Sequence, residues 1–234
     1  MRASSILAVP FHPASSLCYL FFLLGLPACE HATRAGSTSL ITQLTALPDS
    51  AALGAYRRAL AQLATTDQAD RQALFGVFRQ HGFRSWQADR ANRWLLRQDS
   101  LRLVAFQTLE RRYGWPRAKT VGSMSVQHAY LLVQHAPEHV QASYQHTLRA
   151  AHARAELPSP DYATYLDRLE VNQGHPQRYG TQRGRRVLAT GQEEEYLLPV
   201  ADLPHLDQRR ATMQLDPLVP HLRPGTLILT ANPN

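Results

Sequence analysis

The chain has 234 residues, of which 44% are hydrophobic and 18% charged, with 25 Lys and Arg against 18 Asp and Glu. This composition excludes a wholly disordered or collagen-like chain, and the length suits one domain with at most a small appendage. Lys119 is the only lysine, and the arginines are scattered, often beside acids, without any nucleic-acid-binding signature. We therefore expect no nucleic-acid partner.

The first 28 residues have the pattern of an export signal. The single cation Arg2 precedes the apolar segment 17–26, which is followed by Pro27-Ala28-Cys29. A charged start, a short apolar segment and a small residue before the cut describe a signal peptide. The segment Leu26–Cys29 resembles the lipobox of bacterial lipoproteins, whose cysteine is acylated. We expect residues 1–28 to be removed; the alternative is a buried helix at the start of the domain.

This interpretation places the mature protein on a membrane, facing the periplasm or the cell exterior, with its lipid on Cys29. The chain has two cysteines, and Cys18 would leave with the signal. The mature protein would then have no free thiol, which excludes a cysteine nucleophile and a cysteine-based zinc site. Residues 29–48 are rich in Ala, Thr, Ser and Gly and are expected to be a flexible tether.

Helical patterns follow, and the sequence predicts a mainly α-helical single domain over 49–218. Ser50 and Asp67 can each act as the N-cap of a helix, and Pro137 and Pro160 can each open one. The predicted helices are 50–64, 67–82, 85–97, 99–113, 121–136, 137–155 and 159–169. After Leu169, glycines and short strand-like segments predict a β-hairpin within 177–199, then a last helix, 202–213, and a loose tail, 219–234.

The arginines Arg183, Arg185 and Arg186 surround Gly184, and they are the densest basic cluster of the chain. We expect a solvated loop there; the alternative is a contact with phosphate or an anionic membrane surface.

Five of the eleven histidines lie between His128 and His152, which raises the question of a metal site. His139 and His146 share a helical face that points away from the apolar face, and Pro137 interrupts the turn between His135 and His139. We therefore expect no histidine metal site and no cofactor.

His135 differs from these because it lies at the C-terminal end of the most apolar helix, where exposed carbonyl groups favour an imidazolium. It is either a hydrogen-bonded core histidine, like His128, or a general base or ligand-binding donor. Asp167 has two interpretations as well. It is either a structural carboxylate that holds the following ribbon or the group that orients His135.

Several short motifs, in their order along the chain, resemble a bacterial domain family of unknown function, the one numbered 6624. The resemblance covers about 150 residues, is strongest over 66–218, and implies no established activity. Its pieces are Asp67-Gln68 with Arg71, Tyr113 to Pro116, Leu131 to Ala136, Tyr165 to Arg168, Gln177 to Gln182, and a closing segment around Arg209-Arg210 and Pro217-Leu218.

These motifs contain more polar residues than a helical core requires, so we expect some of them to meet in one patch. The first hypothesis is a binding or scaffolding domain, in which the patch holds a small ligand or an envelope protein. The alternative is a hydrolase-like enzyme with His135 as base, Asp167 orienting it, and Arg168 and Gln182 holding an anionic or amide substrate. The candidate ligand-binding residues are Gln134, Arg168, Gln177, Tyr179 and Gln182.

Overall fold

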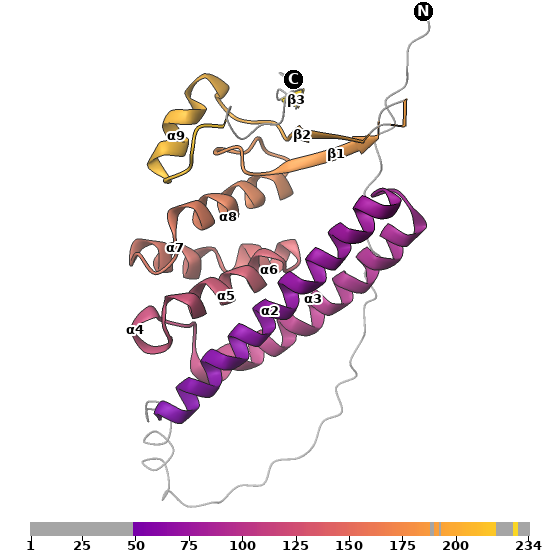
Figure 1. The fold of residues 1–234 in the computed structure, drawn as a ribbon. Helices are drawn as coiled ribbons and strands as arrows, with labels where there is room; N and C mark the ends of the chain where they lie inside the picture. Colours follow the sequence, from indigo (N-terminus) through magenta and orange to yellow (C-terminus); the bar gives the residue numbers. More distant parts are fainter. Residues whose placement is uncertain (1–48, 188–189, 192, 219–226, 229–234) are drawn as a thin grey trace, which may run out of the picture. The chain divides into compact units, whose positions relative to one another are not determined.

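Two long helices open the described part of the chain, α2 (Ser50–His81) and α3 (Trp86–Tyr113) (Figure 1). The computed structural model describes residues 49–187, 190–191, 193–218 and 227–228, all within one compact unit. The expected signal peptide, the tether and Cys29 lie outside the described residues.

Each long helix starts at a side-chain cap and ends at a glycine with positive φ. Asp49 accepts a hydrogen bond from the N–H of Ala52, and Ser85 from that of Ala88, while Gly82 and Gly114 end the two helices. The sequence predicted a break between helices 50–64 and 67–82 and another between helices 85–97 and 99–113. Both breaks are wrong, because α2 and α3 run through them. No Gly or Pro stands at either place, and Thr66 bonds back to the carbonyl of Gln62 within the helix.

Shorter helices follow: α4 (Ala118–Val121), α5 (Ser123–Gln134), α6 (Glu138–Ser143), α7 (Gln145–Ala153) and α8 (Ser159–Asn172). The helix predicted over 121–136 is α5, which starts at Ser123 because Gly122, with a φ of 84°, separates it from the unpredicted α4. The predicted break at Pro137 is confirmed, since α5 ends at Gln134 and α6 begins at Glu138.

The main core gathers apolar side chains from α2, α3 and α5 to α8, with α5 contributing on several sides, as its apolar composition predicted. This core fixes the C-terminal end of α5, where His135 lies. Its most buried members include Leu60, Phe106, Val126, Val133, Leu148 and Tyr165.

The predicted β-hairpin is confirmed: β1 (Arg183–Val187) pairs antiparallel with β2 (Glu193–Leu197). β3 (Leu227–Ile228) adds a parallel partner to β2, so this part of the expected tail belongs to the sheet. Gly184 lies opposite Tyr196, where any Cβ would collide with the tyrosine ring.

The basic cluster that was expected as a loop is therefore part of a strand. Arg183 pairs with Glu195 at 3.0 Å and Arg186 with Glu194 at 2.6 Å, across the hairpin. The last predicted helix is present as a short 3₁₀ turn, η1 (Leu203–His205), followed by α9 (Leu206–Thr212). Within the described residues, no helix is both long enough and apolar enough to cross a membrane.

Candidate functional site

Asp67 lies in the middle of α2, not at a helix start as the sequence predicted, and its side chain is only 1% exposed. Because α2 is continuous, Asp67 and Arg71 stand one turn apart and both reach the end of α5. There the Nδ1 atom of His135 lies 3.0 Å from the Asp67 carboxylate and 2.9 Å from the Nε atom of Arg71. The site thus joins an imidazole, a carboxylate and a guanidinium.

The end of α5 that carries His135 is held by a buried glutamine. The side-chain amide of Gln141 donates to the carbonyls of Gln134 and Ala136, at 3.0 and 2.8 Å, on either side of His135. The side-chain oxygen of Gln141 accepts a hydrogen bond from the side-chain amide of Asn172 in α8. These bonds satisfy carbonyl groups left open at the helix end and fix the backbone that positions the imidazole.

A second layer of charges surrounds this trio. Arg71 also donates to Asp99 of α3 at 2.8 Å, and Asp99 accepts from Arg102 at 3.1 Å. Arg102 pairs in addition with Asp70, and its guanidinium donates to the hydroxyl and carbonyl oxygens of Thr66. The ionic cluster formed by Asp67, Asp70, Arg71, Asp99, Arg102 and His135 thus joins α2, α3 and the end of α5.

The two innermost carboxylates respond differently to this environment. Burial raises the pKa of Asp67, but the hydrogen bond and charge of His135 and the charge of Arg71 outweigh it and hold the pKa below its usual range. Burial raises the pKa of Asp99 above its usual range in spite of Arg71, because the negative charge of Asp67 acts in the same direction. Asp67 is therefore the carboxylate that stays ionised most readily.

Two predicted ligand-binding residues carry buried polar atoms without partners. Among the described residues, Nε of Arg168 has no hydrogen-bond partner, and neither do the amide oxygen and nitrogen of Gln134. Burial lowers the pKa of Arg168; Tyr130 acts against this, and the charge of Arg71 acts in the same direction. Such groups mark a place where an additional polar partner would be favourable.

The hypothesis that Asp167 orients His135 is not supported, because the structure places Asp67 in that position. Asp167 is completely buried and faces the loop that follows α8. It accepts the backbone N–H groups of Arg178 at 2.7 Å, Tyr179 at 2.9 Å and Thr181 at 2.9 Å, as well as the hydroxyl of Thr181. Asp167 has the structural role that was the first interpretation of this residue.

The remaining candidates, Gln177, Tyr179 and Gln182, are buried and belong to this loop instead of to the His135 site. The side chain of Gln177 donates to the carbonyls of Gln182 and Leu198, both at 2.9 Å, and accepts the N–H of Gln182 at 2.7 Å. The carbonyl of Tyr179 accepts from Arg210. The single polar patch expected from the motifs is thus divided in two. One part surrounds His135, and the other closes the loop 177–182.

A cavity of about 420 Å³ lies between α2 and α5, beside the ionic cluster. Gln68 lines it and donates to the Asp67 carboxylate at 2.8 Å, while His128 lines the opposite side with a buried Nδ1 that has no hydrogen-bond partner among the described residues. Burial lowers the pKa of His128, which favours the neutral form of its imidazole. His128 was predicted to be a hydrogen-bonded core histidine, and among the described residues its Nδ1 makes no such bond.

The sequence interpretation missed the role of Asp67, Arg71 and Asp99. The spacing Asp67-x-x-x-Arg71 was a usable signal, since residues four apart on a helix can pair, and both belong to the family motifs. His139 and His146, predicted to face solvent, are exposed. Within the described residues, no group of three or more His, Cys, Asp or Glu side chains is placed to hold a metal ion.

Residues 57–226 match the model of a family of unknown function, DUF6624. The match covers more than half of the chain, and the chain belongs to this family. No match was found among curated proteins or among solved structures. Asp67, Arg71, Asp99, His135 and Arg168 all lie inside the matched range, so the site is part of the family domain.

Proposed function

We propose that this member of the DUF6624 family binds a small anionic ligand at the end of α5, through the Nε2–H group of His135 and the guanidinium of Arg168. The observation that carries the proposal is the environment of the other ring nitrogen. Nδ1 has Arg71 Nε at 2.9 Å and an Asp67 oxygen at 3.0 Å. These two neighbours determine where the proton of the imidazole lies.

Arginine always carries its protons, so in the neutral imidazole Nδ1 accepts from Arg71 and the hydrogen resides on Nε2. Any form with a hydrogen on Nδ1, neutral or charged, would direct that hydrogen against the N–H of Arg71. The contact with Arg71 therefore favours the form in which Nε2–H is the donor, and among the described residues Nε2 has no hydrogen-bond partner.

Arg168 supplies the positive charge of the proposed site. No ion pair involves it among the described residues, and its buried Nε has no hydrogen-bond partner. It acts electrostatically on Tyr130, which lies one turn before Gln134 on α5, and on Arg71, which contacts His135. A carboxylate or phosphate oxygen would give these donors the acceptor that the protein does not provide.

The charges of the ionic cluster leave Arg168 available for an anion. Asp67, Asp70 and Asp99 pair with Arg71 and Arg102 among the described residues. Arg168 takes part in none of these ion pairs, so its positive charge is the one that a bound monoanion would meet.

The hydrolase alternative requires a different arrangement. A general base needs a bare Nε2, hence a hydrogen on Nδ1, and the N–H of Arg71 opposes that form. The orienting carboxylate would be Asp67, because Asp167 is engaged by the loop 178–181. Of the two hypotheses, the geometry thus supports ligand binding better.

Calorimetric titration with inorganic phosphate and with acetate tests the proposal. We expect binding by the full chain, and an affinity at least tenfold lower in His135→Gln and in Arg168→Gln, each of which loses a charge-assisted hydrogen bond. The matched controls His139→Gln and Arg149→Gln change exposed residues and should bind like the wild type. Equal binding by all four variants, or no binding of either anion by the wild type, would contradict the proposal.

Nitrogen-15 NMR of the imidazole separates the two hypotheses directly. We expect the neutral ring of His135 to carry its hydrogen on Nε2, and Arg71→Leu to shift the hydrogen toward Nδ1, since only Asp67 then contacts that atom. A neutral ring with its hydrogen on Nδ1 in the wild type would favour the general base.

We propose further that the protein is exported and anchored to a membrane by lipid on Cys29. The support is the pattern of residues 1–29, a cation, an apolar segment and the Leu26–Cys29 lipobox. Acyl chains contribute about 0.8 kcal/mol per buried methylene, so two chains give a stable anchor. Cys29→Ser should move the protein from the membrane to the soluble fraction; equal membrane association of both proteins would contradict the lipid anchor.

A further inference from the structure

The outer stripe of α3 is a row of exposed side chains that contact no other described element through their ion pairs or hydrogen bonds. Its apolar members, Trp86, Trp94, Leu101 and Val104, are between 50% and 67% exposed. At 100° per residue they fall within about 80° of one another, on the side away from buried Leu95, Leu103 and Phe106. Four large apolar side chains gathered on one helix face form a patch, and such a patch marks an interaction surface.

Arginines lie between these apolar residues on the same face. Arg90, Arg93 and Arg97 are exposed and, by the same helical spacing, belong to the outer stripe. Among the described residues, none of the three has an ion pair or a side-chain hydrogen bond. Asp99 and Glu110 lie on the other side of α3 by helical spacing, whereas exposed Asp89 lies at the margin of the stripe, one turn before Arg93. The stripe therefore combines apolar area with a net positive charge, three arginines against one acid.

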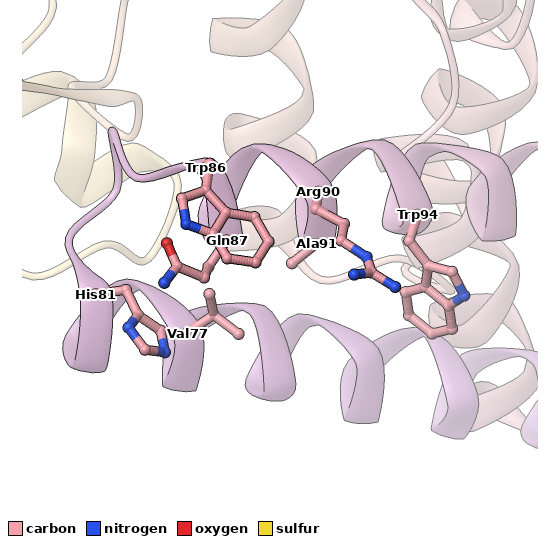
Figure 2. Close-up of a pocket in the computed structure, with 7 residues that line it drawn as sticks. All are labelled: Val77, His81, Trp86, Gln87, Arg90, Ala91 and Trp94. Carbon is pink, nitrogen blue, oxygen red and sulfur yellow. The ribbon is translucent and has the colours of Figure 1, made fainter.

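Figure 2 shows one end of the outer stripe, where Trp86 and Trp94 flank Arg90 and Ala91 on α3. A cavity of about 410 Å³ lies there between α3 and the end of α2, which contributes Val77 and His81. Its wall is mostly apolar, with the Arg90 guanidinium at the edge between the two indoles. An apolar hollow with a cation at its margin suits a molecule that has a hydrocarbon part and an anionic head.

We propose that the outer stripe of α3 lies on an anionic lipid surface, with Trp86, Trp94, Leu101 and Val104 at the headgroup boundary and the three arginines on lipid phosphates. Tryptophan favours this boundary, and arginine covers apolar surface with its stem while its head stays with phosphate. Amphipathic helices with a basic polar part bind anionic interfaces in this way.

Two other occupants fit the outer stripe less well. A second copy of the chain that paired through the same stripe would place three arginines against three arginines, with only Asp89 at each margin. A single-stranded nucleic acid would use the arginines and stack on the indoles, but it would leave the aliphatic Leu101 and Val104 in water. The lipid surface uses both kinds of side chain. This contact is independent of the proposed anion site, with which it shares no residue, and of the lipid on Cys29.

Tryptophan fluorescence tests the proposal locally, because residues 1–48 contain no tryptophan and Trp115, the third in the chain, packs on Phe106 and Tyr144. The probe is full-length Cys29→Ser protein with vesicles of equal phosphatidylglycerol and phosphatidylcholine, or of phosphatidylcholine alone. We expect the emission to shift to shorter wavelength with the anionic vesicles only. The double variant Trp86→Phe, Trp94→Phe should show no shift.

The charge requirement is tested with Arg90→Gln, Arg93→Gln and Arg97→Gln combined. Each arginine at an anionic surface contributes about fivefold in affinity, so the loss should be about 100-fold. The matched control Arg57→Gln, Arg58→Gln, Arg149→Gln removes three exposed arginines elsewhere and should bind like the parent.

Any of five outcomes would overturn the proposal. Four are emission unchanged while the protein sediments with vesicles, equal shifts on both lipid compositions, equal losses in the two triple variants, and an equal shift without vesicles on raising the protein concentration. The last of these would identify a second copy as the occupant. The fifth, a shift produced by a single-stranded oligonucleotide but not by anionic vesicles, would identify nucleic acid.

Discussion

Two buried aspartates, Asp67 and Asp167, have different kinds of hydrogen-bond partner and, we infer, different roles. Both are almost inaccessible to solvent, at 1% and 0% exposure. Asp67 is surrounded by side chains, namely Gln68, Arg71 and the imidazole of His135. Asp167 is surrounded by backbone N–H groups of a single loop, with one hydroxyl.

The two sets of partners differ in whether they can rearrange. Backbone N–H groups cannot lose their protons, so the bonds of Asp167 fix the loop 178–181 in one conformation. The partners of Asp67 are side chains that can move, and one of them, the imidazole of His135, stays partly open to solvent. A buried carboxylate held by backbone is a structural element, whereas one that orients a titratable side chain can control binding.

Asp167→Ala should have the largest effect on stability. It leaves the N–H groups of Arg178, Tyr179 and Thr181 without their acceptor, and each unpaired buried group costs about 1–3 kcal/mol. We expect the free energy of unfolding, measured in urea, to fall by about 4 kcal/mol. Asp89→Asn, at an exposed position, is the control. A loss below about 1 kcal/mol would contradict a structural role for Asp167.

Asp67→Asn should cost less, about 2 kcal/mol of unfolding free energy. Breaking a buried ion pair costs about 3–5 kcal/mol when the partner charge is left alone, but Arg71 keeps its contact with Asp99 at 2.8 Å. The variant should also bind phosphate more weakly, because Arg71 and His135 lose the carboxylate that holds their side chains in place. Full stability together with unchanged anion binding would show that Asp67 has neither role.

The pH dependence of stability should separate the two carboxylates by its sign. The pKa of Asp67 is lowered in the folded protein, so its stabilising contribution is present above its ordinary value near 3.8 and is lost as the pH falls below it. The wild type and Asp67→Asn should therefore converge in stability in acid.

Burial raises the pKa of Asp167 despite its N–H donors, so the folded protein takes up that proton more readily than the unfolded chain. The stability difference between the wild type and Asp167→Asn should therefore widen as the pH falls from neutral toward 3.8. Urea unfolding at a series of pH values measures both trends, and the same sign for the two variants would contradict this distinction.

Thr181→Val should have the smallest effect. It removes the hydroxyl that donates to Asp167 at 2.9 Å but keeps the N–H of the same residue in place. We expect a loss of about 1 kcal/mol of unfolding free energy, because Asp167 retains its backbone donors. Thr120→Val, at an exposed helix position, should change stability little. A loss as large as that of Asp167→Ala would mean that the hydroxyl determines the loop conformation.

Local sequence signals predicted most of the elements. The position of α8, the break at Pro137, the β-hairpin and the last helix follow from caps, prolines and alternating patterns, which depend on neighbouring residues. The errors also have a local cause. Asp67 was interpreted as an N-cap because the side chain suits that role, but α2 continues through it, and its carboxylate pairs with Arg71 and His135 instead.

The sequence by itself determined the mainly helical fold, the family and the side chains available to a site, among them Asp67, Arg71, His135 and Arg168. Only the tertiary structure decided which of them meet. His135 pairs with Asp67, 68 positions away, and not with Asp167, although Asp167 is nearer along the chain. The physical reason is that contacts between helices depend on how all their apolar faces pack together, and no local pattern records that arrangement.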